Sequence, residues 1–434
     1  MRHEAIELLS RYLRINTTNP PGDELKGAQF FAEIFEKEGI AYKIHEPTKG
    51  RASISARITG EGRDDPLILL NHIDVVLAEK EQWSFDPFGG EIKDGYVHGR
   101  GAMDMKGQGI AELMAFLEIK RKGQVPNRDV IFLAVADEEN GGAFGADYLL
   151  KSHYGDFSAG LVLNEGGFGL RDLLPDRPVF LISTAEKAAN WIRVSCEGPP
   201  GHGSVPQKQN ALERLIRALN RLQDMDNPVV ITDVTSEYFR KLAETWVFLK
   251  PYLEDNKEET LIKCLTESGL SEIPQMSAIL RNTISTNVIS GGSKINVIPS
   301  RVEAKLDVRL LPGQDPDQFI AKVKKQLGDE GVKADFIVKD RAEASPIFTD
   351  EYRKIEKVFS RRFPDAVIVP SLLFGSSDSR FFRKKGITSY GVFPVLISMN
   401  DIKMVHGIDE KISEENLVMG SEMFTEIVNS LCGI

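Results

Sequence analysis

Side chains that could hold a metal ion follow the apolar run 67–70. His72 and Asp74 come next in the chain, and because side chains alternate along a strand, both emerge on the same face. A ligating imidazole needs an acceptor for its second ring nitrogen, and a carboxylate two residues away can provide one. Asp104 stands in a glycine-flanked turn from which an oxygen could reach the same ion. The pattern is typical of a metal ligand with its orienting partner.

Two further apolar runs lead into carboxylates. Residues 130–136 are followed by three acidic residues that include Glu138 and Glu139, and residues 161–163 are followed by a glycine-rich turn that contains Glu165. Runs this apolar are typical of buried strands. In open α/β sheets, ligands bind beyond the carboxyl ends of the strands. We therefore expect these carboxylates to lie beside the histidine that follows the first run.

A dinuclear metal site would account for this set of residues. Two divalent ions can be held if one carboxylate bridges them and five side chains converge: His72, Asp104, Glu139, Glu165 and His406. Nitrogen and oxygen ligands without thiolate suit two Zn²⁺ ions, with Co²⁺ or Mn²⁺ tolerated. Such a pair polarises a carbonyl and acidifies a shared water. Glu138 is then left unbound beside a ligand, where it could activate the metal-bridging water and pass the proton to a leaving amine.

The elements that must position these residues change in character along the chain. Residues 110–117 carry an apolar helical face between two buried-strand candidates, an order typical of a mixed, largely parallel α/β sheet flanked by helices. From 188 to 338 the order becomes strand, helix, two strands, helix, strand, which predicts an α+β split-βαβ, ferredoxin-like unit. We expect residues 1–187 and 341–434 to form the catalytic domain and residues 188–340 to form an inserted lid domain.

Length and composition narrow the functional class. With 434 residues the chain exceeds the size that one core usually supports, so two domains are expected. The formal net charge of -10 argues against a general nucleic-acid binder or a binder of anionic membranes, so we expect no nucleic-acid and no membrane partner. The three cysteines are scattered and suggest no disulfide framework. We find no signal-peptide pattern and no apolar run of membrane-spanning length, so we expect a cytoplasmic protein.

The motifs resemble those of the M20 family of metallopeptidases, which includes aminoacylase-1, carboxypeptidase G2 and succinyl-diaminopimelate desuccinylase. The resemblance covers essentially the whole chain, and five motifs stand in the family's order: His72-Ile73-Asp74, Gly99 to Lys106, Asp137-Glu138-Glu139, Glu165 and His406. It implies that Asp74 orients the first ligand, that Asp104 is the bridging ligand, and that the Asp104–Met105 peptide bond is cis. Leu77 replaces the family's usual proline after His-x-Asp-Val-Val, which concerns only the local turn.

The resemblance extends to three motifs of the expected lid. His202, in Gly-His-Gly-Ser, matches a histidine that stabilises the oxyanion and is often supplied by the partner subunit, so the resemblance implies a possible homodimer through the lid. Asn296, in Asn-Val-Ile-Pro, and Arg309, in Asp-Val-Arg, match positions that hold the substrate's carboxylate and acyl group. Arg309 has an alternative, because it lies on a polar strand face where an ion pair with a neighbouring residue such as Asp307 is equally natural.

The expected function is hydrolysis of an amide bond next to a free carboxylate, as in an N-acyl amino acid, a dipeptide or the C-terminal residue of a peptide. Two alternatives stay open. A two-metal phosphoesterase would use the same ions but predicts more basic residues near them than the motifs contain. A catalytically silent homologue could act as a binding protein, although the retained Glu138 opposes this. The segment 224–281 has little periodicity and receives no role from the sequence.

Overall fold

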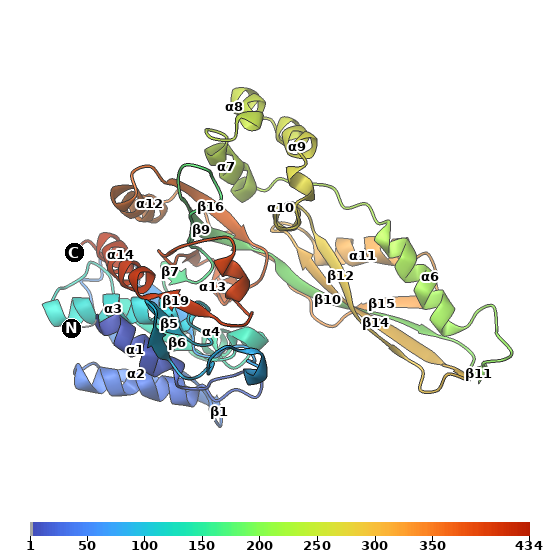
Figure 1. Ribbon diagram of the computed structural model, residues 1–434, viewed down its shortest axis with the longest axis horizontal. Helices are drawn as coiled ribbons and strands as arrows, with labels where there is room; N and C mark the ends of the chain where they lie inside the picture. The colour runs from blue at the N-terminus through green and yellow to red at the C-terminus, as the bar shows by residue number, and fades with distance from the viewer. Residues whose placement is uncertain (1–2) are drawn as a thin grey trace. The chain divides into compact units, whose positions relative to one another are not determined.

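The computed structural model of the protein describes residues 3–434 and divides into two compact units (Figure 1). The first unit runs to Thr184 and includes Ser345–Ser371 and Ser377–Ile434. The second unit consists of Ala185–Ala344 and Leu372–Ser376. Each unit has its own sheet and its own core.

The first unit is built on a ten-stranded mixed sheet in the order β1-β2-β6-β3-β7-β17-β9-β8-β18, with β16 beside β9. Its central strands β6, β3, β7 and β17 are parallel to one another, and antiparallel pairs lie towards both ends. The strands are β1 (Tyr42–Thr48), β2 (Arg51–Ile58), β3 (Leu67–His72), β6 (Val130–Val135), β7 (Leu161–Asn164), β8 (Gly169–Leu170), β9 (Val179–Glu186), β16 (Val367–Leu373), β17 (Thr388–Gly391) and β18 (Leu396–Ile397). The predicted mixed α/β sheet flanked by helices is confirmed.

Helices cover both faces of this sheet. The side chains of β3 show this, because alternate residues pack in different cores. Leu67 and Leu69 belong to one cluster, and Ile68 and Leu70 belong to another. Burial on both faces explains why the strand is apolar throughout rather than alternating. The helices are α1 (Glu4–Leu13), α2 (Leu25–Lys37), α3 (Lys106–Lys122), α12 (Asp350–Arg362) and α14 (Glu414–Cys432) around the first cluster, and α4 (Ala146–Ser152), α5 (Tyr154–Phe157) and α13 (Ser379–Arg383) around the second.

A small sheet in the first unit joins distant parts of the chain. It has the order β19-β5-β4, with β4 (Glu91–Lys93), β5 (Tyr96–His98) and β19 (Lys411–Ser413). The pairing of β19 with β5 is antiparallel and sets Lys411 opposite His98. It therefore brings the residues after His406 alongside the residues before Asp104.

The second unit has a four-stranded sheet in the order β12-β14-β10-β15. Its elements follow one another as β10 (Ala188–Glu197), α6 (Ala211–Gln223), β12 (Thr283–Gly291), β14 (Arg301–Leu310), α11 (Pro316–Leu327) and β15 (Val332–Phe336), which is a split βαβ order. Side chains of α6 and α11 pack with alternate residues of β10 and β14 in one core. A short pair, β11 (Gly201–His202) with β13 (Val297–Ile298), extends from this sheet.

The segment 224–281 is mostly helical. It contains α7 (Asp233–Leu242), α8 (Lys250–Asp255), α9 (Glu258–Glu267) and α10 (Pro274–Leu280). These helices have six to ten residues, too few for a long periodic pattern, which is why the sequence did not reveal them. None of the helices in residues 3–434 combines the length and the apolar character that a membrane crossing requires.

Candidate metal centre

The parallel strands of the first unit deliver three of the predicted residues to one edge of the sheet. His72 is the last residue of β3 and is in register with Val135 at the end of β6. Glu139 lies in the turn that follows β6, and Glu165 directly follows β7, which pairs with β3 in parallel. The carboxyl ends of adjacent parallel strands therefore bring these side chains together.

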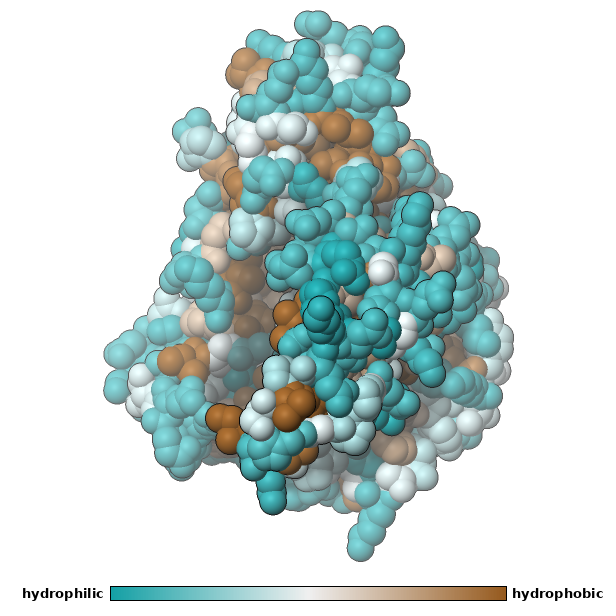
Figure 2. All heavy atoms as spheres, turned by 90° about the vertical axis from the view of Figure 1, so that its right-hand side faces the viewer, coloured by the Kyte–Doolittle hydropathy of each residue, from teal (hydrophilic) through white to brown (hydrophobic). Residues whose placement is uncertain are grey.

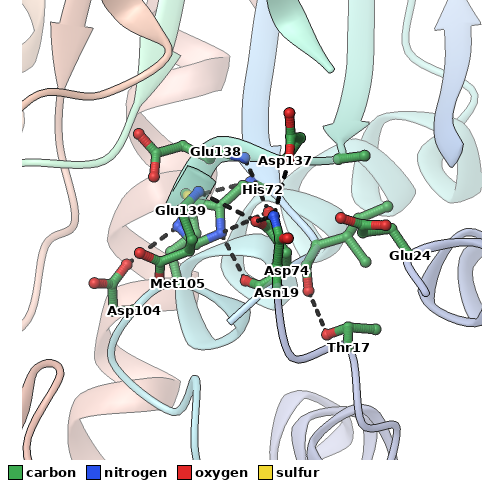
Figure 3. A network of polar contacts seen from close by, with 12 residues as sticks. Thr17, Asn19, Glu24, His72, Asp74, Asp104, Met105, Asp137, Glu138 and Glu139 are labelled. Atoms are coloured by element: carbon green, nitrogen blue, oxygen red, sulfur yellow. Dashed lines mark hydrogen bonds and ion pairs between the residues drawn. The ribbon is translucent and has the colours of Figure 1, made fainter. Parts of the chain in front are cut away.

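The contacts of His72 leave one ring nitrogen available to a metal ion (Figure 3). Its Nδ1 lies 2.9 Å from the backbone carbonyl of Asp74, and because a carbonyl only accepts, Nδ1 carries the hydrogen. In the neutral ring Nε2 is then an acceptor, and it faces Asp104 Oδ1 at 3.1 Å and Glu165 Oε2 at 3.8 Å. Burial by itself lowers the pKa of His72, but these two carboxylates raise it well above the ordinary value.

The Asp74 carboxylate has a different set of partners. It lies 3.7 Å from His72 Nδ1, farther than the carbonyl of the same residue. Its oxygens accept the backbone N–H groups of Glu138 and Glu139, both at 3.1 Å, and the Asn19 side-chain amide at 2.8 Å. Asp74 therefore orients the imidazole through its backbone and fixes the turn after β6 through its side chain.

Asp104 lies between the two histidines. Its Oδ1 faces His72 and its Oδ2 is 3.0 Å from Nε2 of His406, which is also 3.2 Å from Glu139 Oε2. Burial by itself would raise the pKa of Asp104, but the two imidazoles hold it below its usual range. One imidazole on each oxygen is the arrangement that a bridging carboxylate requires. The peptide bond between Asp104 and Met105 is cis, as the resemblance implied.

Negative charge accumulates in this cluster. Burial and neighbouring carboxylates raise the pKa of Glu165 to about 7 and raise the pKa of Glu139. Oε1 of Glu139 is buried and has no hydrogen-bond partner among the described residues. Ligand atoms converge within 4.8 Å of one another in two groups, His72 with Asp104 and Glu139, and His72 with Glu138 and Glu165. Crowded carboxylates, an unsatisfied buried oxygen and available imidazole nitrogens all fit divalent cations.

Glu138 has fewer hydrogen-bonded partners than its neighbours. Its backbone is fixed by Asp74, and its carboxylate lies 3.7 Å from a guanidinium nitrogen of Arg380. Burial raises the pKa of Glu138 well above the ordinary value, and the charges of Glu165 and Asp378 add to this effect. A largely buried carboxyl with a raised pKa beside metal-type ligands is suited to accept and return a proton.

A network of buried charges that the sequence analysis did not identify supports the turn after β6. Asp137 accepts hydrogen bonds from the Arg51 guanidinium at 2.6 Å and from the Asn19 amide at 3.0 Å. Arg51 also donates two bonds to Glu24, at 2.7 and 2.8 Å. These residues come from unrelated sequence contexts, and no local pattern in the sequence indicates that they meet.

The three predicted substrate residues lie in the second unit. His202 is exposed on β11, and its Nδ1 is 2.7 Å from the Ser204 hydroxyl. Asn296 is exposed beside β13, where its carbonyl accepts the N–H of Gly203. Arg309 lies on β14 and forms an ion pair with Asp307 on the same strand, at 2.8 Å. The structure therefore contains the ion pair that was weighed as the alternative for Arg309.

Comparison with known proteins identifies one family. The model of peptidase family M20/M25/M40 matches residues 68–430. Aminoacylase-1 of Sus scrofa is 28% identical over 442 residues, covering 100% of this chain and 96% of that protein. N-fatty-acyl-amino acid synthase/hydrolase PM20D1 of Homo sapiens is 29% identical over 359 residues, covering 80% of this chain and 70% of that protein.

The fold is similar to that of a solved structure, the M20 family metallo-carboxypeptidase Sso-CP2 from Sulfolobus solfataricus. The TM-score is 0.76 at 21% sequence identity, and all of each chain is covered. At this identity the likeness concerns the fold, and the family assignment rests on the family model that matches residues 68–430.

Proposed function

The chain belongs to peptidase family M20/M25/M40, and on that premise we propose that it is a dinuclear metal hydrolase that cleaves an amide bond next to a free carboxylate. The observation that carries the proposal is the convergence of two histidines and three carboxylates, with the carboxylate of Glu138 beside His72 and Glu165. Family membership among peptidases and amidohydrolases does not favour the phosphoesterase or the silent homologue.

Two Zn²⁺ ions are the proposed cofactors, with Co²⁺ or Mn²⁺ able to replace them. His72, Asp104 and Glu165 would hold the first ion, and Asp104, Glu139 and His406 would hold the second, so that Asp104 bridges them. This division follows the distances between the side chains. When bound, such a pair polarises the scissile carbonyl and acidifies a water molecule.

Glu138 is the proposed proton carrier. Its carboxylate accepts a proton from the attacking water and passes it to the nitrogen of the leaving amine, which departs as a neutral group. Its raised pKa supports this role, because a carboxylate whose pKa lies above the ordinary value accepts a proton more readily. Asp74 holds the backbone of Glu138 and so fixes where the carboxylate can reach.

The second unit is proposed to act as a lid that carries the substrate-binding residues. His202 would stabilise the oxyanion, and Asn296 and Arg309 would hold the substrate. Arg309 uses two of its five N–H groups on Asp307 and Ser376, at 2.8 and 3.2 Å, which orients the guanidinium and leaves donors for a carboxylate. Ordering of these residues would follow closure of the lid on the substrate.

A homodimer through the second unit is also proposed. β12 is an edge strand whose residues are largely exposed, including Val288 and Ile289, and an unpaired edge can accept another strand. Figure 2 shows a largely hydrophilic surface with separate apolar areas. Analytical ultracentrifugation would test the dimer, and a monomer at micromolar concentration would contradict it.

A cytoplasmic location is proposed as well, supported by three cysteines that form no disulfide.

The substrate is proposed to be an N-acyl amino acid, a dipeptide or a C-terminal residue. The names of the relatives support this class, because they include an aminoacylase, a fatty-acyl-amino acid hydrolase and a carboxypeptidase. The name of one relative specifies a fatty-acyl group, so the chain length of the acyl group is the main variable to test.

The deciding experiment measures amine release from a panel of N-acyl amino acids of increasing acyl length and from dipeptides, with a generic phosphomonoester as the contrast. We expect hydrolysis of at least one amide, loss of activity on chelation, and recovery on addition of Zn²⁺. Amidated substrates, which lack the free carboxylate, should react poorly. Hydrolysis of the phosphoester alone, or activity that survives complete removal of metal, would contradict the proposal.

A further inference from the structure

The loop 99–105, which carries Asp104, belongs to no helix or strand and is organised by a single buried carboxylate. Oε2 of Glu410 accepts the N–H of Gly101 at 2.9 Å, and Oε1 accepts those of Met103 at 2.7 Å and Asp104 at 3.0 Å. Glu410 is 0% exposed. Buried amides need acceptors, so this side chain takes the place that a neighbouring strand or helical turn would fill elsewhere.

Arg100 extends these contacts to the segment that carries His406. Its Nη1 donates to Glu410 at 2.7 Å, and its Nη2 donates to the backbone carbonyl of Gly407 at 2.6 Å. Gly407 directly follows His406 in the chain. The guanidinium also lies over the Trp83 ring, 4.9 Å from its centroid. Arg100 therefore connects the buried Glu410 carboxylate and the Trp83 ring to the turn that carries His406.

Glu410 and Arg100, which we call the clamp, connect two segments that are about three hundred residues apart in sequence. The hydrogen bonds of the clamp reach the backbone of each segment. They leave the Asp104 carboxylate and the His406 ring free to approach each other, at 3.0 Å. His72 ends β3 and Glu165 follows β7, so the large sheet rather than the clamp places the backbone of these two ligands.

We propose that Glu410 and Arg100 are positioning residues that fix the spacing of Asp104 and His406 and thereby set the affinity for the second metal ion. The inference rests on the proposed metal-dependent function. It predicts unequal effects on the two ions, because the second ion depends on both clamped segments whereas the first depends on only one of them.

The test is a titration of the full chain with Co²⁺ after removal of metal, followed by calorimetry and by visible absorption. The wild type should take up two Co²⁺ ions. In Glu410→Gln the ion held by His72 and Glu165 should lose little affinity, because it shares only Asp104 with the clamped segments, and the other ion should bind about ten- to hundredfold more weakly. The reason is that an amide offers one acceptor oxygen and one donor, so either Arg100 and Gly101 or the amides of Met103 and Asp104 lose their partner.

A matched control is Asp129→Asn. Asp129 also accepts a guanidinium, that of Arg57 at 2.7 Å, and a backbone amide, that of Gly60 at 2.9 Å. It precedes β6 and so lies at the opposite end of the strand from the candidate metal centre. Binding of both ions should be unchanged in this variant.

Arg100→Lys provides the second variant, because lysine keeps the charge but cannot bond Glu410 and Gly407 with one planar group. It should weaken the same ion, and the Co²⁺ absorption of that ion should change most. Retention of two equally tight ions in both variants would overturn the proposal, as would equal weakening of both ions. Loss of folded structure in both variants, judged by circular dichroism, would also overturn it, since the clamp would then be a general folding element. Failure of the wild type to bind Co²⁺ would instead contradict the proposed function.

Discussion

The candidate metal centre and the predicted substrate residues differ in how firmly the surrounding protein holds them. In the first unit, His72 is 2% exposed and Asp74 is 0% exposed, and each has several partners within hydrogen-bond distance. In the second unit, His202 and Asn296 are exposed and bond mainly to their own loop. The same chain therefore builds one set of residues rigidly and presents the other at its surface.

This difference fits the two kinds of chemistry. Ligands of two closely spaced ions must be placed before the ions bind, and buried hydrogen bonds provide that placement. Residues that contact a substrate can be ordered by the substrate itself, and elements with few buried contacts are the ones that move. The comparison therefore predicts that changes in the first unit alter metal binding or the chemical step, whereas changes in the second unit alter the response to substrate.

The largest expected effect comes from Glu138→Gln, which removes the proton acceptor and keeps the shape of the side chain. We expect kcat to fall by about a hundred- to ten-thousandfold with two metal ions still bound, because the proposed ligand set is intact. Glu118→Gln, on the exposed side of α3 beside Lys122, is the control and should behave as wild type. Normal turnover in Glu138→Gln would refute the proton-carrier role.

His202→Ala should have the next largest effect. Loss of one oxyanion donor costs on the order of a hundredfold in kcat or more, and metal content and thermal stability should stay unchanged because the side chain is exposed. Mixing His202→Ala subunits with Glu138→Gln subunits should restore part of the activity if the histidine acts across a dimer. Lack of any recovery would assign His202 to its own subunit.

Arg309→Lys should produce a smaller effect that is confined to binding. We expect KM to rise about tenfold with little change in kcat, because lysine retains the charge but not the planar pair of donors. An amidated substrate, which has no carboxylate, should show the same KM in variant and wild type. A fall in kcat with unchanged KM would indicate that the ion pair with Asp307 has a role in the chemical step instead.

The smallest effect concerns the pH dependence of the metal-free protein. Hydrogen bonds to Asp104 and Glu139 raise the pKa of His406 to about 10. The stabilisation that protonated His406 gives is therefore fully present below pH 6.5, its ordinary pKa, and is lost as the pH rises to about 10. Because this side chain is half exposed, His406→Asn should lower the unfolding temperature in a chelator by only about 1–2 °C near pH 6.

Well above pH 10, where His406 is neutral in the folded protein too, the unfolding temperatures of wild type and His406→Asn should coincide in the chelator. Calorimetry across this range measures the difference directly. A difference that grows with pH would show that the imidazole is neutral in the metal-free protein, and would contradict the pairing of His406 with the two carboxylates.

The sequence by itself determined the class of the first unit and the place of its candidate site. Apolar runs without alternation predict strands that are buried on both faces. The residues that follow neighbouring parallel strands lie at the same edge of the sheet. His72, Glu139 and Glu165 lie together for that reason. The helices and strands of the second unit were likewise predicted from local patterns. Side chains on one face recur about every 3.6 residues in a helix and every two residues in a strand.

Only the tertiary structure decided which distant groups meet. The sequence around Asp74 does not indicate whether its carbonyl or its carboxylate bonds to His72. In the structure the chain turns after β3 and brings the carbonyl closer to the ring than the carboxylate. The contacts of Glu410 and Arg100 join segments whose separation in sequence leaves no periodic signal. Local patterns report which face of an element is buried, whereas pairings between buried polar groups arise only when packing leaves each donor one acceptor within reach.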